Sequence, residues 1–311
     1  GWRRWCVSAP ANGTEAFASE LRAAGIGFRL DEPLARYTTM GLGGPADLLA
    51  SPASVSEMVK LLALAREADL PVRVIGAGSN LLIDDAGVRG VVIATGALDG
   101  VHFVSEGMVE AGAGVHFPTL VRQTASRGLR GLEAGVGIPG SLGGILTMNA
   151  GAYQFSIGPL VREAEAVSPE KGRMVLPGKD IDFRYRASSF GASLIVARAK
   201  LSLTPDDPLA VKRDMNQHMR FRKETQPVGV KSAGCIFKNP PGDSAGRLID
   251  RAGLKGFQVG GARVSEVHAN FIVHEGRAKT KDVLALIDAV RERVLRETSI
   301  LLETEVMIWT P

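Results

Sequence analysis

Two glycine-rich turns, about sixty residues apart, have the composition of anion-binding loops. The first spans residues 76–81 after the strand-like run 72–75, and the second spans residues 135–144. Glycine lets the backbone adopt positive φ and approach a ligand closely, and consecutive N–H groups in such turns bind anions. Each could instead be a tight loop without a ligand. Two of them at separate strand ends favour a diphosphate held between two subdomains, and neither has the lysine of a triphosphate loop.

A third chemically dense segment, residues 231–240, contains Cys235 between Gly234 and an apolar pair. A cysteine there could be a buried packing residue. Alternatively, Lys231 and Lys238 could favour its thiolate or hold an anionic substrate. The residues that follow Arg186 are uncharged as far as residue 197, so its guanidinium could either form a surface ion pair or bind a ligand.

Bulk composition narrows the function classes. The 311 residues have a formal charge of +4 and a pI of about 9.2, and the basic residues are scattered, which does not indicate nucleic-acid binding. Residues 134–161 carry no charge, but seven glycines and two prolines argue against a membrane span. The five histidines lack metal-ligand spacing, so no metal site is expected.

Cysteine usage and the N-terminal residues indicate the compartment. Cys6 and Cys235 are far apart in unlike surroundings, which argues against a disulfide framework and for a reducing compartment. Arg3-Arg4 is not followed by an apolar run, so no secretion signal is expected. The cytoplasm is therefore the expected location.

Periodicity and turn residues predict a mixture of helices and strands. Ser54 and Glu57 form a capping-box pair ahead of a helix, Pro118 opens a helix that Gly128 closes, and residues 105–107 join a hairpin. Without a strict βαβ rhythm, α+β domains are favoured. Further expected elements are a short helix ending near residue 23, strands at 72–75, 91–93, 193–203, 271–273 and 300–309, a linker at 204–208, and helices at 208–224 and 280–297.

Taken together, several motifs in register make the chain resemble the UDP-N-acetylenolpyruvoylglucosamine reductase family from about residue 30 to 309. The motifs are residues 37–44 (YTTMGLGG), the two glycine turns, Tyr185-Arg186-x-Ser188, residues 232–240 (SAGCIFKNP) and residues 302–306 (LETEV).

The resemblance implies an α+β fold, with two FAD-binding subdomains like those of vanillyl-alcohol oxidase flavoproteins and a C-terminal α+β substrate domain. The expected divisions are 1–98 and 99–204 for FAD and 205–299 for substrate, with a C-terminal strand, 300–311, returning to the first region. It also implies noncovalent FAD and NADPH as hydride donor. The substrate would be a UDP-sugar whose enolpyruvyl group is reduced to give UDP-N-acetylmuramate for peptidoglycan precursor synthesis. No nucleic acid or membrane partner is expected, and the protein would be a monomer or weak oligomer.

Carried over residue by residue, the resemblance implies three catalytic positions. Arg186 matches the catalytic arginine, Glu305 the catalytic glutamate, and Cys235 the proton donor, where many members have serine. A thiol, with a pKa of about 8.5, is a better acid than an alcohol. Substrate-binding positions would be Lys223, Lys238 and Asn239. Cofactor-binding positions would be Gly76, Ala77, Gly78, Ser79, Asn80, Leu81, Gly137, Ile138, Pro139, Gly140, Ser141 and Gly144.

One departure and two alternatives accompany the resemblance. The chain between Arg186 and Val196 lacks the tyrosine-bearing insertion of one subgroup, which indicates the shorter, second type and leaves closure by a tyrosine loop unsupported. An FAD-dependent oxidase of the same fold is an alternative, but residues 37–101 hold no histidine to tether the flavin. The other is a flavin- or nucleotide-sugar-binding module without turnover, favoured if Arg186, Cys235 and Glu305 did not converge.

Overall fold

A computed structural model describes residues 11–152 and 155–311. Arg3, Arg4, Cys6 and Gln154 lie outside the described residues. The chain divides into two compact units, each built from separate segments. Unit 1 takes in the chain up to Glu32, Ala46–Ala77 and Arg89–Arg220, and unit 2 takes in Pro33–Pro45, Gly78–Val88 and Phe221–Pro311.

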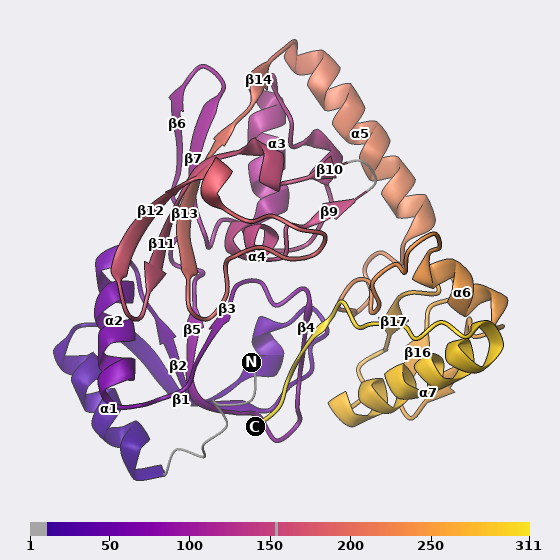
Figure 1. The fold of residues 1–311 in the computed structure, drawn as a ribbon, viewed down its shortest axis with the longest axis horizontal. Coiled ribbons are helices and arrows are strands. Elements are labelled where there is room, and N and C mark those ends of the chain that lie inside the picture. Colours follow the sequence, from indigo (N-terminus) through magenta and orange to yellow (C-terminus); the bar gives the residue numbers. More distant parts are fainter. Residues whose placement is uncertain (1–10, 153–154) are drawn as a thin grey trace. The chain divides into compact units, whose positions relative to one another are not determined.

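Unit 1 contains a four-stranded sheet with the order β1-β2-β5-β3. The strands are β1 (Gly27–Pro33), β2 (Pro45–Ser51), β3 (Val72–Ile75) and β5 (Val88–Ala94), and β3 runs parallel to β5. The helices α1 (Ala11–Ala23) and α2 (Val55–Glu67) lie beside this sheet (Figure 1). Their shared core includes Phe17, Leu21, Met58, Leu62 and Ile93.

The start of α2 confirms Ser54 as the N-cap residue, but the reciprocal bond of the expected capping box goes to Ala53 instead of Ser54. The Ser54 hydroxyl accepts the Glu57 N–H at 3.1 Å, and the Glu57 carboxylate accepts the Ala53 N–H at 2.8 Å. Because the Ser54 hydroxyl satisfies one N–H group of the first helical turn, the helix begins where the sequence places it.

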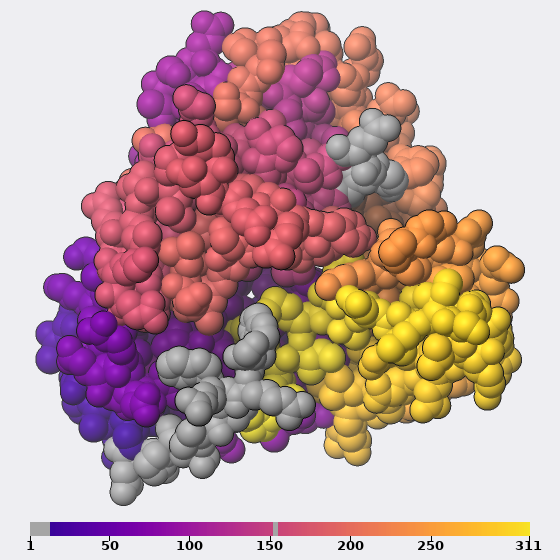
Figure 2. All heavy atoms as spheres, in the orientation of Figure 1, coloured from indigo at the N-terminus to yellow at the C-terminus, as the bar shows by residue number. Residues whose placement is uncertain are grey.

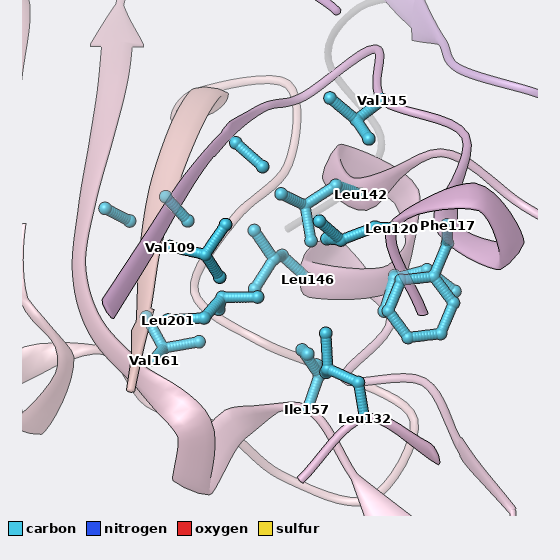
Figure 3. Packing of buried hydrophobic residues seen from close by; sticks show 14 of the residues in the cluster. Val109, Val115, Phe117, Leu120, Leu132, Leu142, Leu146, Ile157, Val161 and Leu201 are labelled. Carbon is cyan, nitrogen blue, oxygen red and sulfur yellow. The ribbon is translucent and has the colours of Figure 1, made fainter. Parts of the chain in front are cut away.

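Unit 1 also contains a five-stranded antiparallel sheet with the order β12-β11-β13-β7-β6. Its strands are β6 (Val101–Ser105), β7 (Met108–Gly112), β11 (Val161–Ser168), β12 (Gly172–Pro177) and β13 (Ile195–Ser202). The helices α3 (Phe117–Ser126) and α4 (Leu142–Thr147) cover the apolar face of this sheet. Figure 3 shows Val109 and Leu201 of the sheet facing Leu142 and Leu146 of α4.

The other face of this sheet carries paired charges. Arg198 on β13 pairs with Glu110 at 3.1 Å and with the buried Glu165, and Lys200 pairs with Glu163 at 2.9 Å. The alternation of apolar and charged residues along β13 therefore corresponds to one buried face and one solvent-facing ion-pair network.

Several short elements complete unit 1. β8 (Leu129–Arg130) pairs with β14 (Thr204–Pro205), and β9 (Gly151–Ala152) pairs with β10 (Phe155–Ser156). Among the described residues, unit 1 also has the 3₁₀ turns η2 (Glu133–Gly135), η3 (Gly158–Leu160) and η4 (Gly178–Asp180), whereas η1 (Leu34–Tyr37) belongs to unit 2. The helix α5 (Pro208–Thr225) contains the division between the two units.

Unit 2 combines a two-stranded parallel pair, a three-stranded antiparallel sheet and two further helices. β4 (Leu81–Ile83) pairs with β18 (Met307–Trp309), and β15 (Gln258–Val259), β16 (Ala262–Val264) and β17 (Ile272–Val273) form the other sheet. Its helices α6 (Ala245–Arg251) and α7 (Thr280–Thr298) pack through residues such as Leu248, Val283 and Ile287, and α7, yellow in Figure 2, forms much of the visible surface of this unit.

Two sequence-based expectations were wrong in part. Residues 204–208 are not a free linker, because Thr204 and Pro205 pair with β8 and Asp206 binds Arg130 at 2.7 Å. The strand expected over 300–309 is only β18, preceded by an isolated bridge between Thr304 and Phe237. None of the helices in the described part of the chain has the length and hydropathy of a membrane span. The described residues of the uncharged run 134–161 form α4, the short strands β9 and β10, and 3₁₀ turns.

Candidate active site

The first glycine turn links β3 to β4 through close backbone contacts. Gly78 has φ +57°, and a Cβ on it would lie 2.0 Å from the carbonyl oxygen of Tyr37. The Gly78 carbonyl also accepts the Thr39 N–H at 3.2 Å. Only glycine fits this position, because both the conformation and the space exclude a side chain.

The second glycine turn leads into α4. Gly137 and Gly140 have φ +76° and +150°, and Ser141 is the N-cap residue of the helix, with its hydroxyl facing the Gly144 N–H at 3.5 Å. The turn is held against the chain before α3, since the Gly140 carbonyl accepts the Phe117 N–H at 2.9 Å. Ser141, a candidate cofactor residue, therefore also shapes the loop.

The two glycine turns meet within unit 1. A Cβ built on Gly76 would lie 2.0 Å from the Ser141 hydroxyl oxygen. This proximity suits a diphosphate, because N–H groups of two neighbouring glycine-rich turns can bind one anionic group. FAD, the group that the resemblance implies, carries such a diphosphate.

Cys235 and Glu305 are brought together in unit 2 by backbone hydrogen bonds. Cys235 is half-buried and pairs with Phe271 in an isolated antiparallel bridge. The next residue, Ile236, accepts the Glu305 N–H at 2.8 Å, and the Lys238 N–H donates to the Glu303 carbonyl at 2.9 Å. The segment that contains Glu305 therefore lies beside the segment that contains Cys235.

Asn80 joins the first glycine turn to this pair. Its side-chain amide donates to the carbonyl of Glu305 at 3.1 Å, and its own carbonyl accepts the Met307 N–H at 3.0 Å. A residue expected to contact the cofactor therefore also places the candidate glutamate.

Arg186 lies in unit 1 at the tip of a tight turn. Arg184 and Ala187 exchange backbone hydrogen bonds of 2.9 and 3.2 Å, and Arg186 between them has φ +54°. Its guanidinium carbon lies 5.0 Å from the centre of the Tyr185 ring. A left-handed arginine is uncommon, and such conformations cluster at functional sites.

The three candidate substrate-binding residues have different surroundings in unit 2. Lys223 is exposed on α5, and Lys238 forms an ion pair with Glu303 at 3.5 Å. The Asn239 side-chain oxygen accepts the N–H of Ala245 at 3.0 Å and so takes part in the start of α6. An exposed pair such as Lys238–Glu303 is weak and can yield to an anionic ligand.

Sequence reasoning missed two asparagines and a threonine that support the candidate residues. Asn149 accepts the Gly158 N–H at 3.1 Å and donates to the Arg184 carbonyl at 2.9 Å, beside the Arg186 turn. Asn270 binds the chain next to Cys235, and the Thr39 hydroxyl donates to the Ser232 carbonyl at 2.7 Å. A polar amide within the apolar run 269–273 was the available signal for Asn270.

One histidine near Cys235, His268, has a shifted pKa, and the described residues lack a metal-binding cluster. Burial lowers the pKa of His268, and the charge of Lys255 acts in the same direction. Its neutral ring can accept the Asn270 N–H, which lies 3.2 Å from Nδ1. The described residues contain no cluster of three or more His, Cys, Asp or Glu side chains that could hold a metal ion.

Comparison with known proteins identifies consistent relatives. Residues 46–176 match the family model of an FAD binding domain, and residues 226–309 match that of the UDP-N-acetylenolpyruvoylglucosamine reductase C-terminal domain. A reductase of that name, numbered 2, from Symbiobacterium thermophilum is 47% identical over 90% of this chain and 92% of its own length. The Bacillus subtilis reductase is 41% identical over 94% and 98%.

A solved structure agrees with these matches. The crystal structure of UDP-N-acetylenolpyruvylglucosamine reductase from Thermus caldophilus superposes with a TM-score of 0.79 at 39% identity. The alignment covers 92% of this chain and 99% of that one.

Proposed function

This chain belongs to the UDP-N-acetylenolpyruvoylglucosamine reductase family, and from that premise we propose that Arg186, Cys235 and Glu305 carry the chemistry of its reaction. The protein is an FAD-dependent oxidoreductase of peptidoglycan precursor synthesis. It uses NADPH to reduce the enolpyruvyl group of UDP-N-acetylglucosamine enolpyruvate to UDP-N-acetylmuramate. The predicted α+β fold and the FAD cofactor are confirmed.

The glycine turns are the proposed site of the FAD diphosphate. The contact between Gly76 and Ser141 supports this placement, since it brings the two turns together. When bound at these turns, FAD would supply the chemistry of hydride transfer between NADPH and the enolpyruvyl group. The remaining work of the protein is to place the substrate and to supply a proton.

Arg186 is the proposed partner of the substrate carboxylate, where negative charge develops as the hydride adds. A guanidinium presents two parallel N–H donors to a carboxylate, and donors preorganised toward developing charge usually give the largest catalytic contribution. Lys223, Lys238 and Asn239 are the proposed contacts to the rest of the UDP-sugar, whose negative charge suits the two lysines.

Cys235 is the proposed general acid, and Glu305 orients or polarises the reacting group beside it. The Cys235 thiol gives its proton to the carbon next to the carboxylate, which completes addition across the double bond. The observation that supports this assignment is the 2.8 Å hydrogen bond from the Glu305 N–H to the Ile236 carbonyl. This bond holds the segment that contains Glu305 beside the segment that contains Cys235.

The test measures two rates separately in Cys235→Ala: reduction of the flavin by NADPH and reoxidation of the flavin by substrate. We expect NADPH to reduce the flavin at nearly the wild-type rate, while reoxidation by substrate falls by about 10²–10⁴-fold, the range for loss of a general acid. Cys235→Ser is the matched control and should keep appreciable activity, because its hydroxyl can also donate. Reoxidation of the alanine variant at wild-type speed would show that Cys235 only packs.

Finer properties follow as proposals. We divide the chain into FAD-binding regions 1–98 and 99–204 and a substrate region 205–299, with the C-terminal strand pairing back to β4. The soluble substrates NADPH and UDP-sugar favour a cytoplasmic location. A monomer or weak oligomer is the proposed assembly, which analytical ultracentrifugation would test.

A further inference from the structure

The backbone beside Cys235 is held largely by one residue, Asn270, which is 2% exposed. The Asn270 carbonyl accepts the Ile236 N–H at 2.8 Å. Its side-chain oxygen accepts the Phe237 N–H at 2.9 Å, and its side-chain nitrogen donates to the Phe237 carbonyl at 2.8 Å. Three of the four polar backbone groups of residues 236–237 are therefore bound by Asn270.

The fourth of these groups connects to the candidate glutamate. The Ile236 carbonyl accepts the Glu305 N–H at 2.8 Å and faces the Val306 N–H at 3.3 Å. Residues 236–237 are thus hydrogen-bonded to Asn270 on one side and to the segment that contains Glu305 on the other. Displacing the stretch would move Cys235 and Glu305 together.

Asparagine suits this task for a chemical reason. Its amide offers one acceptor and one donor side by side, which matches the N–H and C=O of a single residue. The orientation is determined, because the Phe237 N–H requires an oxygen and the Phe237 carbonyl requires an N–H. Phe237 is 2% exposed, so water does not replace the amide there.

We propose that Asn270 is a positioning residue that sets the placement of Cys235 and Glu305 for protonation of the substrate. This inference rests on the proposed roles of those two residues. Asn270 itself contacts neither substrate nor flavin in this assignment. Its contribution is the fixed geometry of the chain between the two catalytic side chains.

The first test compares Asn270→Ser with Thr280→Val in the flavin-loaded protein. A serine hydroxyl cannot span both backbone groups of Phe237, so reoxidation by substrate should fall on the order of 10–100-fold, as for a small misplacement of reacting groups. Flavin reduction by NADPH should stay near wild type. Thr280 is a matched control: it is 0% exposed, lies in the same unit and donates to the Ile83 carbonyl at 2.7 Å, away from residues 235–237.

The second test reads the thiol directly, without turnover. In apoprotein with Cys6→Ser, the rate of alkylation of Cys235 by iodoacetamide should rise several-fold in Asn270→Ser and stay unchanged in Thr280→Val. In unmodified protein, the Phe237 amide should exchange hydrogen far more slowly than exposed amides of unit 2. That measurement applies even if Asn270→Ser does not fold.

Each outcome bears on the inference. Selective loss of reoxidation with altered thiol reactivity supports it. Equal losses in both half-reactions, values matching Thr280→Val, or rapid exchange at Phe237 would overturn it. If Cys235→Ala reoxidises at wild-type speed, the proposed function fails instead, and the alkylation and exchange rates still report separately on whether Asn270 holds the chain.

Discussion

Gly76→Ala should damage the protein through one specific contact, the approach of Gly76 to Ser141. The new Cβ would lie 2.0 Å from the Ser141 hydroxyl oxygen and 3.2 Å from its Cβ. Gly76 does not have positive φ, so alanine adds no backbone strain there. Overpacking costs about 1–3 kcal/mol, and turning the hydroxyl away from the Gly144 N–H removes an N-cap worth about 1 kcal/mol. We expect a total loss of about 2–4 kcal/mol and poor flavin retention.

A second substitution should relieve that loss if the contact is its cause. Ser141→Gly removes the obstructing atoms and costs only a few tenths of a kcal/mol at an N-cap. Gly76→Ala/Ser141→Gly, which moves the glycine from one turn to the other, should therefore be more stable than Gly76→Ala alone. The coupling between the two sites should be about 2 kcal/mol, within the range for residues in contact.

Urea unfolding of the apoproteins measures this cycle, and visible absorbance after gel filtration measures bound flavin. The midpoints should shift without a change in slope if only native stability is altered. Additive effects, with coupling below about 0.5 kcal/mol, would refute the argument that the two turns meet. Full flavin in Gly76→Ala would refute the proposed placement of the diphosphate.

Two further predictions concern Arg186 and His268. Arg186 has φ +54°, and a left-handed conformation costs a non-glycine residue about 1–2 kcal/mol. Arg186→Gly should therefore be about 1 kcal/mol more stable than Arg186→Ala in urea unfolding, and reoxidation of the flavin by substrate should be slow in both variants. Equal urea midpoints would show that the turn stores no strain. Burial lowers the pKa of His268 in the folded protein. As the pH falls below about 6.5, the unfolded chain therefore binds a proton at this residue that the folded protein does not yet bind. The free energy of unfolding should fall over that pH range. Urea midpoints at about pH 7.5 and 5.5 should differ less in His268→Gln than in wild type, and identical differences would contradict this account.

Local signals account for the elements that the sequence predicted well. The Ser54–Glu57 capping pair, the turn at Gly107 and the proline near the start of α3 each act within a few residues, so the sequence alone indicates α2, the β6–β7 hairpin and α3. The error at Thr204 and Pro205 has the opposite origin. Their partners, Arg130 and Leu129, are far away in the chain, and no local pattern reports such pairing.

The candidate site could be predicted only in part for the same reason. Arg186 and Glu305 were identified by resemblance to a family, because an arginine in a left-handed turn and a glutamate near a short strand have no local signature. Asn270 was missed because its importance lies in bonds to Phe237, 33 positions earlier. Asn80 was expected at the cofactor, and its bond to Glu305 depends on a segment 225 positions later.

The distant pairing of Asn80 with Glu305 has a consequence for how the protein is made. Unit 2 is assembled from three stretches of chain, and its β4 strand pairs with β18 near the other end of the chain. During translation, β4 leaves the ribosome long before its partner strand exists. Closing contacts so distant is slow, so Glu305 should be among the last residues to reach its place. A nascent chain can therefore form much of unit 1 before the segment that carries Glu305 has been made.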